Sequence, residues 1–133
     1  MHIRTLLVKV LSKHIIWPIW LLIIFVLSFI PGDRLPEIEW ESISVDTLAH
    51  FTMYSVLCFL MLFPFCTNNF LNLSKSSVYL RVILVSIAIG FIVELIQGNF
   101  IYRRYFDPKD IIINGFGTIF GVFMYHLISR KLV

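Results

Sequence analysis

Four long apolar runs, at residues 15–30, 46–65, 78–97 and 111–128, dominate this chain of 133 residues. Each run is close to the roughly 20 residues that a helix needs to cross a hydrocarbon core about 30 Å thick. Each must be helical there, because unpaired backbone groups are costly in lipid. We therefore predict an all-α, polytopic membrane protein, in which a bundle of four transmembrane helices forms a single domain over residues 1–133.

The composition also indicates that lipid surrounds this chain. Hydrophobic residues make up 59% of the chain and charged residues only 14%, which is far from the average of soluble domains. The net charge of +3 is scattered among the apolar runs without a basic stripe, so we expect no nucleic-acid partner. The first run lacks a small-x-small cleavage pattern, and we therefore expect an uncleaved anchor.

The basic residues predict an orientation. If the four runs alternate in direction, seven basic residues lie on the side of the N-terminus, the middle loop and the C-terminus, against four on the other side. The seven are Arg4, Lys9, Lys13, Lys75, Arg81, Arg130 and Lys131. The positive-inside rule then predicts an N-in, C-in, multi-pass protein of the bacterial inner (plasma) membrane.

Polar residues recur at helical spacing in three of the runs, and residues three, four or seven apart share a helix face. The three stripes are Asp46, His50 and Tyr54; Ser86, Gly90, Glu94 and Gln97; and Asp110, Asn114, Gly117, Gly121 and Tyr125. The most polar members of all three lie toward the outer side. A charged side chain at mid-bilayer costs about 2.5–3.5 kcal/mol, so we expect His50, Glu94 and Asp110 to face one inner pocket that opens outward.

This pocket can carry acid–base and anion-binding chemistry. We assign the candidate catalytic roles to His50, Glu94 and Asp110, with His50 moving protons. Arg104, and Arg103 beside it, can hold a phosphate or carboxylate, and Arg104 can also pair with Glu94 or Asp110. The other expected ligand-binding residues are Asp46, Tyr54, Gln97 and Asn114.

Metal and nucleotide chemistry lack the usual sequence signals. One histidine with three carboxylates is present, but the double-histidine spacings typical of metal sites are absent, so we predict no metal and no cofactor. There is no Gly-rich phosphate loop and no nucleophile elbow. The sequence leaves open whether any reaction is catalysed.

Several of these residues also have purely structural interpretations. Asp46 can cap the second helix, Gln97 and Asn114 can hydrogen-bond between helices, and Gly117-x-x-x-Gly121 can pack helices within the chain or between two copies in a homo-oligomer. The acidic segment at residues 33–41 is either an extended strand-like segment or an interfacial loop. We also expect Pro64 to end the second span.

The ordered polar residues resemble the VanZ-like family of small bacterial membrane proteins. The matching positions are Asp46-Thr47-Leu48-Ala49-His50-Phe51 with Tyr54, then Glu94-x-x-Gln97, then Arg104, and Asp110-x-x-x-Asn114-x-x-Gly117-x-x-x-Gly121. The resemblance implies a four-helix membrane domain and an association with low-level teicoplanin resistance, without a mechanism. Two arginines stand where the family pattern has one, and the distance from Asp110 favours Arg104.

We expect the protein to bind or modify an envelope lipid or a lipid-linked cell-wall intermediate at this outer pocket. One alternative is a non-catalytic partner or scaffold of a cell-envelope protein that uses the acidic segment as its contact. Another is a small transporter, which is less favoured because the inner halves of the second and fourth runs are apolar apart from glycines and Tyr125.

Overall fold

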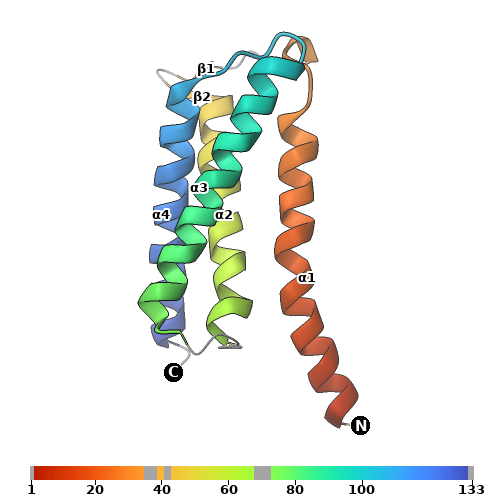
Figure 1. The fold of residues 1–133 in the computed structure, drawn as a ribbon, viewed down its shortest axis with the longest axis vertical. Coiled ribbons are helices and arrows are strands. Elements are labelled where there is room, and N and C mark those ends of the chain that lie inside the picture. Colours follow the sequence, from red (N-terminus) through yellow and green to blue (C-terminus); the bar gives the residue numbers. More distant parts are fainter. Residues whose placement is uncertain (1, 35–38, 41–42, 68–72, 132–133) are drawn as a thin grey trace.

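The computed structural model describes residues 2–34, 39–40, 43–67 and 73–131. Its helices are α1 (His2–Ser28), α2 (Val45–Thr67), α3 (Lys75–Phe100) and α4 (Pro108–Lys131). The four helices lie side by side, with both chain ends at the same end of the bundle (Figure 1). At the opposite end, which we call the polar end, α1 and α3 end and α2 and α4 begin. The predicted four-helix bundle is therefore confirmed.

Three of the helices are long and apolar enough to cross a membrane: α2 over Val45–Cys66, α3 over its full length, and α4 over Pro108–Arg130. In α1 the apolar part is shorter and runs from His14 to Ser28. Helices α2, α3 and α4 extend up to three residues beyond the predicted runs at each end; α3, for example, begins at Lys75 rather than at residue 78. Helix α1 begins at His2, well before its predicted run at 15–30, and ends at Ser28. A hydropathy pattern marks the lipid-embedded part of a helix, whereas hydrogen bonding continues into the polar flanks.

The connection from α1 to α2 is partly extended. It contains a short 3-10 helix, η1 (Gly32–Arg34), and two short strands, β1 (Glu39–Trp40) and β2 (Ile43–Ser44). The strands pair antiparallel, with Trp40 opposite Ile43. Within the acidic segment at residues 33–41, the extended interpretation fits Glu39 and Trp40, whereas Asp33 and Arg34 belong to η1. Glu37 and Glu41 lie outside the described residues.

Two local expectations about α2 were wrong. Ser44, not Asp46, caps the helix, because its Oγ accepts a hydrogen bond from the backbone N–H of Thr47 at 3.1 Å. Asp46 lies in the first turn instead. Pro64 lies inside the helix, which continues to Thr67; a proline disrupts the turn before it and leaves the residues after it free to continue.

Close contact between α2 and α4 depends on two glycines. A methyl group on Gly117 would collide with the backbone carbonyl oxygen of Phe51, and one on Gly121 would collide with that of Ser55. The Gly117-x-x-x-Gly121 face thus lies against a helix of the same chain, as expected for small residues between membrane helices. This contact fixes the rotation of α4 relative to α2, and with it the direction of the polar side chains on both helices.

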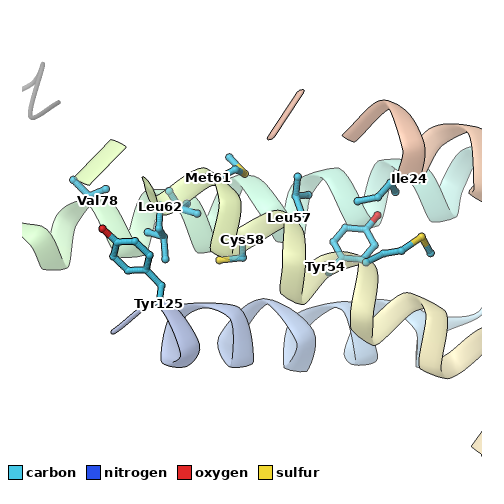
Figure 2. Close-up of a cluster of buried hydrophobic side chains, with 10 residues drawn as sticks. Ile24, Tyr54, Leu57, Cys58, Met61, Leu62, Val78 and Tyr125 are labelled. Carbon is cyan, nitrogen blue, oxygen red and sulfur yellow. The ribbon is translucent and has the colours of Figure 1, made fainter. Parts of the chain in front are cut away.

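The buried apolar cluster lies mainly along α2 (Figure 2). Tyr54, Leu57, Cys58 and Leu62 are fully buried there. From α1, Ile24 packs into the same cluster, and Trp20 donates a hydrogen bond from Nε1 to the carbonyl oxygen of Met53 at 2.9 Å. These contacts hold α1 against α2 in the half of the bundle nearer the polar end.

Candidate polar site between the helices

Buried polar side chains gather in the half of the bundle nearer the polar end and at mid-helix. They are Ser28, His50, Ser55, Ser86, Glu94, Gln97, Asn114 and Thr118. Toward the chain termini, the described core consists of apolar and aromatic side chains such as Leu62, Val78 and Tyr125. The polar groups therefore belong to one end of the bundle rather than to a path through it.

His50 lies at the centre of this group and is 1% exposed. Its Nδ1 is 3.1 Å from Oδ1 of Asn114 on α4. Its Nε2 is 4.0 Å from Oδ1 of Asp46, one turn earlier on α2, and 3.9 Å from Oδ2 of Asp110 on α4. The close α2–α4 contact thus brings two of the expected stripes together at the imidazole.

Arg104 comes from the connection between α3 and α4 and reaches back to α2. Its Nη1 donates to both carboxylate oxygens of Asp46, at 3.0 Å and 3.2 Å. This pairing differs from the expected one with Glu94 or Asp110. The difference arises because the α3–α4 connection folds over the first turn of α2, a geometry that helical spacing within each run does not encode.

Glu94 is held by the backbone instead of by an arginine. Its Oε1 accepts a hydrogen bond from the N–H of Asp107 at 2.7 Å, just before α4 begins. Its Oε2 is buried and has no hydrogen-bond partner among the residues that the structure describes. Glu94 therefore fixes the start of α4 and leaves one carboxylate oxygen available for a further partner.

The two adjacent arginines have different surroundings. Arg104 has a side chain that is 13% exposed, whereas Arg103 is exposed and stacks over the ring of Tyr102, 5.4 Å from its centroid. The backbone of Arg103 has a φ of 55°, the left-handed region that glycine usually occupies. This turn directs the two side chains differently, and only Arg104 joins the group around His50.

The other expected residues lie near the site in different roles. Gln97 donates a hydrogen bond to the carbonyl oxygen of Ser28 at 2.8 Å and so joins α3 to the end of α1. Tyr54 is fully buried one turn below His50, and its hydroxyl group lacks a partner within the described chain. Its ring lies against Gly90, which also lies close to Asn114.

Sequence reasoning missed four polar contributors. Ser55 on α2 donates to the carbonyl oxygen of Phe51 at 2.7 Å. Thr118 donates to the carbonyl oxygen of Asn114 at 2.9 Å and pairs with Ser86 on α3, also at 2.9 Å. Its position four residues after Asn114 marks it as part of the same stripe. Ser28 and Trp20 lie on α1, and Ser28 is distinguished in the sequence as the one hydroxyl residue of the run at 15–30.

A cavity of about 420 Å³ opens between α1 and α2 beside this group. Its lining combines apolar side chains from both helices with five polar ones: the hydroxyl residues Ser28 and Thr52, and the ionisable residues Asp46, His50 and Arg104. Leu27 on α1 and Leu48 on α2 lie on its wall and are 44% and 56% exposed. A surface of this kind faces acyl chains in a membrane, so the cavity joins a lipid-facing opening to a charged interior.

A second cavity, of about 460 Å³, lies toward the other end of the bundle. Its lining is mostly apolar and includes Trp17, Phe65 and Val82, with His14 and Arg81 as its polar members. Among the described residues, no carboxylate lines this cavity. The first cavity is thus the one that adjoins the residues expected to carry chemistry.

The fold and the site define an integral membrane protein of bundled helices whose buried polar groups converge beside a cavity at one end. A family model described as VanZ/LLP1 matches residues 15–129, so the chain belongs to the VanZ/LLP1 family. This agrees with the resemblance carried by the polar stripes. Comparison with curated proteins and with solved structures found no match.

Proposed function

We propose that this protein binds the anionic headgroup of an envelope lipid or lipid-linked cell-wall intermediate in the cavity between α1 and α2. The observation that carries the proposal is the combination, in one cavity, of exposed apolar walls with Arg104 and His50. A lipid has the same division between apolar chain and charged headgroup. Leu27 and Leu48 would contact the chain, and the polar group would contact the head.

Arg104 is the headgroup contact in this proposal. A guanidinium group offers a planar set of N–H donors that matches phosphate oxygens. Asp46 orients it through Nη1, and its Nε is buried without a hydrogen-bond partner in the described residues. Because α2 and α4 both begin at the polar end, their N-terminal backbone dipoles also favour an anion there.

His50 is the candidate proton-transfer group if the lipid is also modified. It lies within 4.0 Å of two carboxylates and lines the same cavity as Arg104. General acid–base catalysis requires such a side chain within hydrogen-bond reach of the reacting group. The distribution of buried polar residues speaks against transport, because they stop at mid-helix and an apolar core follows.

We further propose that the polar end faces outward from the bacterial inner membrane, with both termini in the cytoplasm. The support is the excess of basic residues on the side of the termini. Single cysteines at positions 40 and 75, in a variant that lacks Cys66, would be labelled in intact cells with a membrane-impermeant thiol reagent. Labelling at 40 alone is expected; labelling at 75 alone would invert the orientation.

Lipid binding is tested with purified protein in lipid nanodiscs by native mass spectrometry, using a polyprenyl diphosphate and phosphatidylglycerol as probes. Arg104→Gln should weaken binding of the preferred probe at least tenfold, equivalent to about 1.4 kcal/mol. Arg103→Gln is the matched control, because it removes the same charge from the neighbouring exposed position, and it should bind as the wild type does. Equal binding by all three proteins would refute the proposed role of the site.

A further inference from the structure

Asp46, His50 and Asp110 form a cluster of metal-ligand side chains within the polar group. The two aspartates each offer one carboxylate oxygen, and His50 offers one imidazole nitrogen. These three atoms lie within 4.8 Å of one another. They come from the first two turns of α2 and the first turn of α4. The sequence predicted no metal because double-histidine spacing is absent, but here the ligands converge from two helices.

The distances fit a shared cation better than direct hydrogen bonds. His50 Nε2 lies 4.0 Å and 3.9 Å from the two carboxylates, beyond the roughly 2.7–3.2 Å of an N–H···O bond. Around a tetrahedral ion with bonds of about 2.0–2.2 Å, neighbouring ligand atoms lie about 3.3–3.6 Å apart. The three ligand atoms lie within 4.8 Å of one another, so their separations would shorten by about 0.3–1.5 Å on binding such an ion.

The opposite side of the imidazole has the partner that a metal ligand needs. Nδ1 donates to Oδ1 of Asn114 at 3.1 Å, which leaves the lone pair of a neutral ring on Nε2. Metal-binding histidines usually donate their other N–H to such a group, which fixes the ring. His50 is 1% exposed, and its Nε2 faces the two carboxylates at distances of 4.0 Å and 3.9 Å.

The local charge also favours a divalent cation. Taken as ionised, Asp46, Asp110 and Glu94 carry three negative charges, whereas Arg104 supplies one positive charge. The N-terminal dipoles of α2 and α4 offset about one further charge, and Asp107 at the mouth adds one negative charge, so about two negative charges remain uncompensated. Uncompensated charge is costly at membrane depth, and one divalent ion would balance this group.

We propose that Asp46, His50 and Asp110 bind a divalent transition-metal cation, Zn²⁺. Imidazole with carboxylates suits this ion better than Mg²⁺. Three protein ligands leave an open coordination position, as in catalytic rather than structural zinc sites. Asp46 and His50 line the cavity, so the open position can take a phosphate oxygen of the headgroup; this last step rests on the proposed function.

The test measures the metal alone, without lipid. Protein purified in detergent without a polyhistidine tag is stripped with a chelator, and Zn²⁺ and Mg²⁺ are titrated by calorimetry. The wild type should bind one Zn²⁺ per chain and prefer it to Mg²⁺, and its Tm should rise with Zn²⁺. His50→Gln and Asp110→Asn should each weaken binding at least tenfold, and the exposed controls His126→Gln and Asp33→Asn should not.

Each other outcome is decisive. A wild type that binds no Zn²⁺ overturns the proposal even if the variants fail to fold, and so does binding that only His126→Gln abolishes. The lipid experiment distinguishes this proposal from the proposed function. Lipid binding in chelator by a protein that binds no Zn²⁺ would support the proposed function and reject the metal site. Zn²⁺ binding without lipid binding would support the metal site and reject the proposed function.

Discussion

Arg104 donates to both carboxylate oxygens of Asp46, at 3.0 Å and 3.2 Å, although 58 residues separate them in the chain. The pair joins the α3–α4 connection to the first turn of α2. Since Oδ1 of Asp46 also lies 4.0 Å from Nε2 of His50, Asp46 links the arginine to the imidazole. The arrangement gives Arg104 a position that its neighbour Arg103 lacks.

Loss of the Arg104 charge should destabilise the fold, whereas loss of the Arg103 charge should not. We expect Arg104→Gln to lower the free energy of unfolding by about 1–2 kcal/mol, because Asp46 would lose its partner. The side chain of Asp46 is 40% exposed, so water offsets part of the lost interaction. Unfolding in detergent followed by circular dichroism would measure this, and an equal effect of Arg103→Gln would contradict the assignment.

The α2–α4 contact predicts a sharp difference among three glycines of one helix. Gly117→Ala and Gly121→Ala should each destabilise the bundle by about 1–3 kcal/mol, because the added methyl group meets a backbone carbonyl of α2. Gly115→Ala is the matched control: its Cβ would meet nothing within 4 Å. That substitution should be neutral or stabilising by up to about 1 kcal/mol, since alanine favours the helix. Thermal unfolding that ranks all three alike would contradict the packing.

Ser86 and Thr118 form a buried hydroxyl pair whose direction can be deduced. Thr118 donates its only hydroxyl proton to the carbonyl oxygen of Asn114, so Ser86 must donate to Thr118. A double-mutant cycle with Ser86→Ala and Thr118→Val should give a coupling energy of about 0.6 kcal/mol, and at most about 1.7. Strictly additive effects would show that the two hydroxyl groups do not interact.

The association with teicoplanin resistance that the family resemblance implies leads to a testable cellular phenotype. In cells expressing the protein, alanine substitutions at His50, Glu94, Arg104 and Asp110 should each increase teicoplanin susceptibility while the protein still accumulates in the membrane. The exposed substitutions Asp33→Asn and His126→Gln serve as controls and should leave susceptibility unchanged. Four folded variants with wild-type susceptibility would separate the polar site from that phenotype.

The helices were predictable from sequence because hydropathy reports lipid contact directly. The polar stripes were predictable too, since helical periodicity fixes which residues share a face. Asp46, His50 and Tyr54 do lie along one side of α2, with His50 and Tyr54 buried. The capping residue of α2 could not be predicted in this way. Ser44 and Asp46 are both suitable capping residues, and only the backbone conformation distinguishes them.

Pairings between elements could not be predicted in the same way. Which carboxylate meets Arg104 depends on how the α3–α4 connection turns, and that turn passes through the left-handed backbone of Arg103. The convergence of Asp46, His50 and Asp110 depends on how closely Gly117 and Gly121 allow α4 to approach α2. Both are relations between helices, which periodicity within one helix does not contain.

Photocrosslinking in cells tests most directly whether a headgroup-bearing lipid enters the cavity beside Arg104. A benzoylphenylalanine is placed at Leu48, on the cavity wall, or at Ile112, which has a similar exposure of 58% against 56% and a similar depth on α4. With ³²P-labelled lipids, we predict strong labelling at position 48 that Arg104→Gln abolishes, and weak labelling at position 112 that it leaves unchanged. Labelling at position 48 that is indifferent to Arg104→Gln would contradict lipid binding at this site.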